Sequence, residues 1–369
     1  MRRLQKILFV LVLFVSVWGV NVRAEELVAN EPQKEEGLNV REFILEHISD
    51  SYVWHITKIG EHEISIPLPV IVYSQLSGWH VFLASAFHEG KAYEGLSIAV
   101  EGKYKGKIVE TDSKGIEIRP FDISITKNAF SLLFSSILLI VIIMSVARSY
   151  KKNPMQSRKG FVGFMEMFIM NINDDVIKPC VGKDYKRYAP YLLTVFFFIF
   201  INNVLGLIPL FPGGANVTGN IAITFVLAVL TFLIVNLSGS KEYWREILWP
   251  DVPLWLKVPL PLMPLIELVG VFTKPFALMI RLFANMLAGH SIVLGLTCLI
   301  FVTVKMGPVM NTSMTVLSFL FSIFIGFVEI LVAYIQAYIF TMLSAVFIGL
   351  ARVEPHHKKE IENTDTQSL

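Results

Sequence analysis

The sequence predicts an all-α polytopic membrane protein with about five membrane helices, the last two long and strongly tilted to near-horizontal, plus a small β-rich N-terminal exported domain. Three observations support this fold class: 54% of the 369 residues are hydrophobic, long apolar stretches follow residue 126, and short alternating runs precede it. A bilayer core about 30 Å thick needs about 20 apolar residues in a helix. The formal net charge is only +2, so we expect membrane lipid and no nucleic acid among the partners.

Residues 1–24 are predicted to be a secretory signal peptide. A basic start with Arg2, Arg3 and Lys6 precedes an apolar run, Ile7 to Val20, that is too short to span a bilayer. Small residues end this run, and we expect cleavage after Ala24. A retained amphipathic anchor is the alternative.

Residues 25–125 are predicted to form an exported, periplasmic β-rich domain with a disordered start. Glu25 to Gly37 is acidic and polar, as in disordered segments. From about Val53 to Asp122, runs rich in Ile, Val and Tyr alternate with polar residues, which indicates strands at 63–66, 70–73, 96–100, 107–110 and 115–118. Five histidines lie in this region: His47, His55, His62, His80 and His88. Their spacing matches no metal-ligand signature, so we expect them to be scattered polar side chains and expect no metal or cofactor.

Residues 126–352 are predicted to be the membrane domain. The first span is Asn128 to Ala147, and a cluster of basic residues follows it: Arg148, Lys151, Lys152, Arg158 and Lys159. Because basic residues favour the cytoplasmic side, the preceding domain lies outside, in agreement with the signal peptide. Phe161 to Ile172 is too short to span, and we interpret it as a cytoplasmic surface segment.

Four further apolar stretches follow, and the last two are unusually long. Tyr191 to Leu210 and Ile221 to Leu237 are ordinary spans, joined by an exterior turn without basic residues. Leu262 to Val304 and Met314 to Leu350 exceed the length of a perpendicular crossing, so we expect both to be steeply inclined. This topology places the polar tail 353–369 in the cytoplasm of a bacterial inner-membrane protein.

An arginine lies in the middle of the first long stretch. At helical spacing Ala277, Arg281 and Asn285 share one stripe. Small residues in such a stripe let another helix approach closely. An arginine in hydrocarbon costs at least about 2.5–3.5 kcal/mol on insertion scales, which predicts a functional role. An arginine that snorkels to the headgroups would need a position near a helix end.

Other polar groups occur in the two long stretches. Glu329 and Gln336 are seven residues apart and therefore on one helix face. Polar groups at this depth should face protein or a water-filled cavity, as we also expect for Glu267 and His290. Glu329 and His290 could handle protons as an acid and a base, or form a structural hydrogen-bonded pair between two helices.

The segment from Arg281 to Gly289, preceded by Lys274-Pro275 and followed by Gln336 to Phe340, resembles subunit a of F-type ATP synthase. The stretch from Asn203 to Pro209 is also similar to that family, and the resemblance covers about residues 122–352. It implies that Arg281 is the essential ion-release cation. The ion pathway would then include Asn285, His290, Glu329, Gln336, Glu267 and Asn203.

Two departures from the family pattern concern this pathway. Many bacterial members have glutamate at the position of His290 and histidine at the position of Glu329, so the two residue types are exchanged in this chain. If the two side chains are in contact, the exchange preserves the pair. Gly206 stands where many members have aspartate, which implies a differently lined entry route.

The resemblance implies a non-catalytic stator subunit with two offset half-channels, which carry protons to and from the carboxylates of a c-ring. The implied partners are the c-ring, the peripheral-stalk subunit b and other ATP synthase subunits. A secondary transporter that binds an anionic substrate at Arg281 is the alternative, and internal inverted repeats would favour it. An intramembrane hydrolase would need a nucleophile beside a base, or paired carboxylates at a spacing the sequence does not show.

Overall fold

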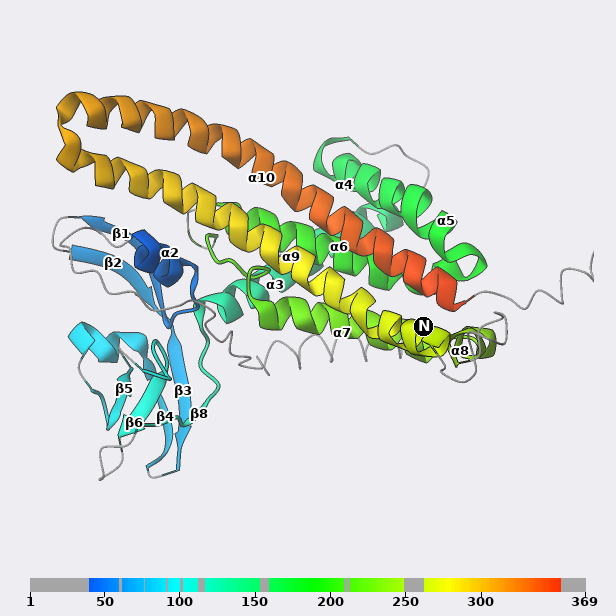
Figure 1. Cartoon of the computed structure of the whole chain (residues 1–369), viewed down its shortest axis with the longest axis horizontal. Coiled ribbons are helices and arrows are strands. Elements are labelled where there is room, and N and C mark those ends of the chain that lie inside the picture. Colours follow the sequence, from blue (N-terminus) through cyan, green and yellow to red (C-terminus); the bar gives the residue numbers. More distant parts are fainter. Residues whose placement is uncertain are drawn as a thin grey trace, which may run out of the picture. The chain divides into compact units, whose positions relative to one another are not determined.

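A computed structural model describes residues 40–59, 62–75, 77–90, 92–99, 102–111, 117–152, 159–208, 211, 213–248 and 262–352. The expected signal peptide 1–24, the acidic leader from Glu25 to Gly37 and the polar tail 353–369 lie outside these residues. The described part is mostly helical, with short strands in its N-terminal region (Figure 1). Two compact units make up the chain.

The first unit comprises Met1–Ile137, Val204–Val217 and Leu287–Phe327. Its N-terminal part is β-rich, as the alternating pattern predicts, and a short helix is the first element that the structure describes there. The elements in chain order are α2 (Val40–Ile48), β1 (Val53–Ile59), β2 (His62–Pro67), β3 (Pro69–Ser74), β4 (Gly78–Leu83), the 3-10 helix η1 (Ala84–Gly90), β5 (Leu96–Ile98), β6 (Ile108–Thr111), β7 (Glu117–Ile118) and β8 (Phe121–Asp122).

These strands form three small antiparallel sheets with the orders β1-β2, β4-β3-β8 and β5-β6-β7. Between β3 and β4 the register pairs Tyr73 with Trp79 and Pro69 with Leu83. The strand β8 continues this sheet on the other side of β3, where Phe121 pairs with Tyr73. The β3 strand is therefore central, with a neighbour on each edge.

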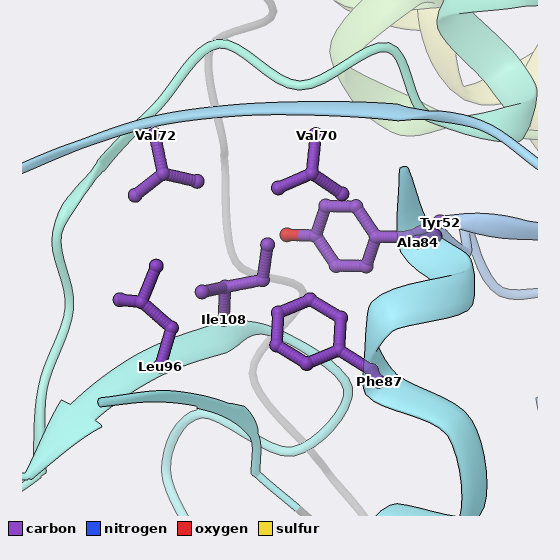
Figure 2. Close-up of a cluster of buried hydrophobic side chains, with 7 residues drawn as sticks. All are labelled: Tyr52, Val70, Val72, Ala84, Phe87, Leu96 and Ile108. Atoms are coloured by element: carbon purple, nitrogen blue, oxygen red, sulfur yellow. The ribbon is translucent and has the colours of Figure 1, made fainter. Parts of the chain in front are cut away.

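The hydrophobic core of the β-rich region lies between two of these sheets. In β3 the side chains of Val70 and Val72 are fully buried, while the alternate positions are not, as the pleat of a half-buried strand requires. Figure 2 shows these two valines pointing toward side chains from β5, β6 and η1, and the whole cluster consists of Tyr52, Val70, Val72, Ala84, Phe87, Leu96 and Ile108.

A buried hydroxyl is paired within this core. The Tyr52 hydroxyl donates a hydrogen bond to the carboxylate of Asp122, the second residue of β8. Burial, and then the negative charge of Asp122, raise the pKa of Tyr52 above its ordinary value. The neutral tyrosine therefore links the residue before β1 to the last strand, β8.

Backbone hydrogen bonds join the β-rich region to the first membrane helix, α3 (Lys127–Lys152). The Ile125 N–H donates to the Pro69 carbonyl at 3.1 Å, and the Lys127 N–H donates to the Ser51 carbonyl at 2.9 Å. The side chain of Asp50 accepts from the Asn128 N–H at 3.0 Å, so it satisfies a donor in the first turn of α3. The strand region thus passes into the helix without a free linker.

Among the described residues, five helical stretches are long and apolar enough to cross a membrane, which confirms the predicted number. They are α3, the continuous stretch Gly160–Leu207, α7 (Ile221–Ser238), α9 (Leu262–Thr303) and α10 (Pro308–Ala351). The second stretch contains α4 (Gly160–Asn171), the π-helix η2 (Ile172–Ile177), α5 (Lys178–Val181), the 3-10 helix η3 (Gly182–Asp184) and α6 (Tyr185–Leu207). The short helix α8 (Lys241–Leu248) follows α7, and the 3-10 helix η5 (Val304–Met306) joins α9 to α10.

The last two helices are long, as the sequence predicts, and α10 begins six residues before the predicted start at Met314. Helix α9 has 42 residues and continues through Pro275, and α10 has 44. At 1.5 Å per residue they measure about 63 and 66 Å, roughly twice the thickness of the hydrocarbon core. Their inclination to the membrane stays a prediction.

The second unit comprises Leu138–Asn203, Thr218–Met286 and Val328–Leu369, and aromatic packing involves the part of α10 that belongs to it. The ring of Tyr334 in α10 meets Phe168 of α4 and two rings of α6, Phe196 and Phe200, with centroid distances of 5.8, 5.9 and 6.1 Å. Edge-to-face pairs of this kind add about 0.5–1.5 kcal/mol each beyond their buried area. They position the middle of α10 beside α6.

The C-terminal end of α10 is held by polar contacts and a close backbone approach. Arg352 forms an ion pair with Asp184, and the Ala351 carbonyl accepts from the Ser240 N–H at 2.8 Å. Gly349 lies against the backbone carbonyl of Cys180, where a Cβ atom would overlap the oxygen. The helix can approach α5 this closely only because residue 349 has no side chain.

Candidate functional site

The predicted functional arginine lies near the midpoint of α9. Arg281 is nineteen residues after Leu262 and twenty-two before Thr303, so it is far from either helix end. Its side chain is exposed on the surface of the chain. Among the residues that the structure describes, no carboxylate pairs with its guanidinium group.

Helix α9 has two contrasting faces around this arginine. Leu278, Leu282 and Met286 are buried, with no more than 3% of each exposed. The predicted stripe of Ala277, Arg281 and Asn285 is exposed instead. The small alanine and its neighbours leave the arginine and the amide accessible from outside the chain, as close approach by another helix would require.

Asn203 links α6, the start of the α7 segment and α10. Its side chain is fully buried. The Asn203 Oδ1 atom accepts from the Thr218 hydroxyl at 2.6 Å, and its Nδ2 donates to the Ala333 carbonyl at 3.5 Å. Gln336, one helical turn after Ala333, is 7% exposed. The structure therefore brings Asn203 close to the part of α10 that carries Gln336, and Thr218 is a partner that sequence reasoning did not find.

Glu329 lies two turns earlier on α10 and is half-buried. One of its carboxyl oxygens, Oε1, is buried and has no hydrogen-bond partner among the described residues. A buried carboxyl oxygen without a partner is costly unless water or a proton satisfies it.

His290 is positioned by the C-terminal end of α6, within the first unit. Its Nε2 atom lies 3.1 Å from the Gly206 carbonyl oxygen. A carbonyl can only accept, so Nε2 carries a hydrogen and donates it to this carbonyl. Gly206 is in the last turn of α6, where backbone carbonyls lack helical partners, and His290 therefore caps this helix.

The imidazole of His290 occupies the space beside Gly206. A Cβ atom at position 206 would lie 3.5 Å from the ring atoms Cε1 and Nε2, and 3.3 Å from the Ala215 carbonyl. The two departures from the family pattern, at Gly206 and at His290, are thus in direct contact with each other. The expected contact of His290 with Glu329 would join the two units and stays a prediction.

Glu267 in α9 lies near the polar side chains of Tyr243 and Asn236. The charge of Glu267, after the larger effect of burial, raises the pKa of Tyr243 in α8. The Tyr243 hydroxyl donates to Asn236 Oδ1 at 3.4 Å. A cavity of about 30 Å³ lies beside them, enough for a water molecule, and is lined by Thr231, Phe232, Val235, Asn236, Tyr243, Val271, Lys274, Pro275, Phe347 and Leu350.

Comparisons with known proteins agree with the sequence motifs. A family model described as ATP synthase A chain matches residues 130–349. A second, described as a domain of unknown function (DUF8433), matches residues 43–127.

Curated relatives carry the same name. ATP synthase subunit a 2 of Chlorobaculum tepidum is 43% identical over 261 residues, which cover 68% of this chain and 70% of the relative. ATP synthase subunit a of Chloroherpeton thalassium is 41% identical over 253 residues, with 66% and 72% covered. The subunit of Myxococcus xanthus is 38% identical over 242 residues, with 64% and 75% covered. The chain therefore belongs to the subunit a family of the F-type ATP synthase, whose members are multi-pass membrane-sector proteins that act with the other ATP synthase subunits in proton transport and ATP synthesis.

Proposed function

We propose that this stator subunit forms two offset half-channels, which carry protons to and from the carboxylates of a c-ring, and that Arg281 drives proton release and prevents a direct leak. The observation that carries the proposal is an exposed arginine midway along a membrane helix, without a carboxylate partner in the described part of the chain. A permanent charge at that depth needs a protein or water surface opposite it. A rotor helix with a buried carboxylate supplies such a surface.

The charge of Arg281 is sufficient to release a proton from a passing carboxylic acid. A carboxyl group in lipid stays neutral because burial disfavours its charged form. At a separation of 4 Å and an effective dielectric constant of 20, an arginine attracts a carboxylate by about 4 kcal/mol. That energy lowers the carboxyl pKa by about 3 units, since one unit corresponds to 1.36 kcal/mol. The subunit moves protons in this way and is itself not a catalyst.

The exterior half-channel is proposed to contain Asn285, His290, Glu329, Gln336 and Asn203. The partnerless oxygen of Glu329 supports this, because a water or a transferred proton would satisfy it. The hydrogen bond between His290 and the Gly206 carbonyl supports it as well, because it holds the imidazole ring at the end of α6.

The interior half-channel is proposed to begin at Glu267. The neighbouring cavity of about 30 Å³ can hold a water molecule, and the polar groups of Asn236, Tyr243 and Lys274 line it. These groups supply both donors and acceptors, as a proton path through ordered water requires.

The proposed topology places the C-terminus in the cytoplasm of a bacterial inner-membrane protein, with residues 25–125 as a periplasmic domain after a cleaved signal of residues 1–24. Basic residues at the end of α3 support this orientation, including Arg148 and Lys151. The membrane domain would extend from 126 to 352, before the polar tail 353–369. We further propose the c-ring and the peripheral-stalk subunit b as partners.

Replacement of Arg281 tests the proposal. In vesicles that contain the assembled complex, Arg281→Ala should abolish ATP synthesis driven by a proton gradient, while the amount of assembled complex stays normal. Arg281→Lys is the matched control, because it keeps a positive charge without the guanidinium geometry, and we expect it to retain more function than alanine. Normal synthesis by Arg281→Ala would contradict the proposed role.

A further inference from the structure

The sheet β4-β3-β8 has an apolar surface on the side opposite the hydrophobic core. In β4 the outward side chains are Trp79, Val81 and Leu83, which are 61%, 71% and 52% exposed. On the neighbouring strands, Tyr73 and Phe121 are 41% and 60% exposed. These five residues define the apolar sheet face.

The strand register arranges the apolar sheet face as a regular grid. Phe121, Tyr73 and Trp79 form one row across the three strands, and the rings of Tyr73 and Trp79 are 5.1 Å apart. Paired residues on antiparallel strands point to the same side of a sheet. The next row pairs Ile71 with Val81 and, through the hydrogen bond from the Ile123 N–H to the Ile71 carbonyl, continues beyond β8.

A third row completes the grid beside the first membrane helix. Pro69 pairs with Leu83, and the Ile125 N–H donates to the Pro69 carbonyl at 3.1 Å. Of the nine described positions in the three rows, none is charged. An antiparallel sheet with one solvated face normally carries polar residues on that face, and the outer face of this sheet is apolar instead. The outer face therefore indicates a second apolar environment.

The chain connection identifies this environment. Ile125 belongs to the third row, and α3 begins only two residues later, at Lys127. A trans chain covers at most about 3.6 Å per residue, so this row lies within about 7 Å of the start of α3 along the chain. Helix α3 is long and apolar enough to cross a membrane, and its exposed side chains include Ile137 and Val141, which are 61% and 59% exposed. The third row of the apolar sheet face is thus joined directly to the start of a candidate membrane helix.

The chemistry of the face fits lipid better than protein. Its polar atoms are the Trp79 indole N–H and the Tyr73 hydroxyl, each at the tip of an apolar ring. Tryptophan and tyrosine with this character are enriched where the membrane meets water. A protein interface would need about one hydrogen bond per 100–200 Å², which the face does not offer from its side chains.

We propose that the apolar sheet face docks onto the headgroup–acyl boundary of the bilayer leaflet from which α3 starts. The β-rich domain is then a membrane-surface module, with Trp79 and Phe121 among the lipid. This inference does not depend on the role of Arg281.

Fluorescence quenching by brominated lipid tests this docking. The full chain is reconstituted in phosphatidylcholine vesicles with or without bromine on the acyl chains, and the signal of Trp79 is obtained as the difference between wild type and Trp79→Phe. We expect brominated lipid to quench most of this signal, and aqueous iodide to quench little of it. Val81→Asp, at the most exposed position of the face, should reverse both effects without disturbing the core.

A matched control places tryptophan on the other side of β4. Tyr93 packs on Phe82, which faces the core, with ring centroids 4.9 Å apart. The fluorescence that Tyr93→Trp adds to the Trp79→Phe background should not be quenched by brominated lipid. Quenching of Trp79 by iodide alone would overturn the proposal. Protection from iodide without quenching by brominated lipid would also overturn it, since a protein segment would then cover the face.

Discussion

Gly206→Asp is expected to disable this subunit, although the resemblance places aspartate at this position in many relatives. The Cβ atom of the new side chain fits, at 3.5 Å from two ring atoms of His290 and 3.3 Å from the Ala215 carbonyl. The carboxyl group extends beyond it and meets the imidazole. The ring must therefore move, and the hydrogen bond from Nε2 to the Gly206 carbonyl is lost.

The cost can be estimated from these two effects. A lost hydrogen bond costs about 0.5–1.5 kcal/mol, and overpacking of a filled site costs about 1–3 kcal/mol. The sum is about 1.5–4.5 kcal/mol, which lowers the population with His290 in its native position about 10- to 1600-fold, since 1.4 kcal/mol is tenfold. ATP-driven proton pumping by inverted vesicles, measured with a pH-sensitive dye, should fall accordingly.

Two further variants separate steric crowding from other causes. Gly206→Ala should retain pumping, because its Cβ atom needs only a shift of a few tenths of an ångström and alanine favours the helix by up to about 1 kcal/mol. In the Gly206→Asp background, His290→Ala should restore the thermal stability that the aspartate removes. Normal pumping and stability in Gly206→Asp alone would refute the reasoning.

Three other predictions concern different parts of the chain. Because burial raises the pKa of Tyr52, the folded state keeps this proton at pH values where the unfolded chain loses it. The melting temperature, measured by circular dichroism, should thus fall as the pH rises above about 10 and be unchanged below. Tyr52→Phe should reduce this fall. Gly349→Ala should lower the melting temperature of the purified chain, because the added methyl group overlaps a backbone carbonyl of α5; an unchanged value would contradict the close approach. If His290 and Glu329 are in contact, the exchange His290→Glu with Glu329→His should recover part of the ATP synthesis that either single change loses, and no recovery would argue against the contact.

Local patterns in the sequence predicted most of the helices and strands. Hydrophobic length was sufficient for α3, α7, α9 and α10, because a membrane span needs only a continuous apolar segment. Alternation was sufficient for β3, where Val70 and Val72 are buried between less buried neighbours. It did not reveal β4, because Trp79, Val81 and Leu83 are apolar on the outward side and Phe82 is apolar on the inward side.

The candidate site was only partly predictable, for the same reason. Helical periodicity placed Arg281 and Asn285 on one stripe, and the structure leaves both exposed. Pairings between distant segments carry no local signal. The contact of His290 with Gly206 spans 84 residues, and it depends on the packing of α9 against the end of α6.

The backbone junction between the strands and α3 has a practical consequence. Hydrogen bonds at Ile125 and Lys127 leave no free linker between the β-rich domain and the start of α3. An antibody fragment bound to this domain would therefore move together with the start of this helix. In single-particle images it would serve as an orientation marker, and its angular spread would report how far that helix rocks while the motor runs.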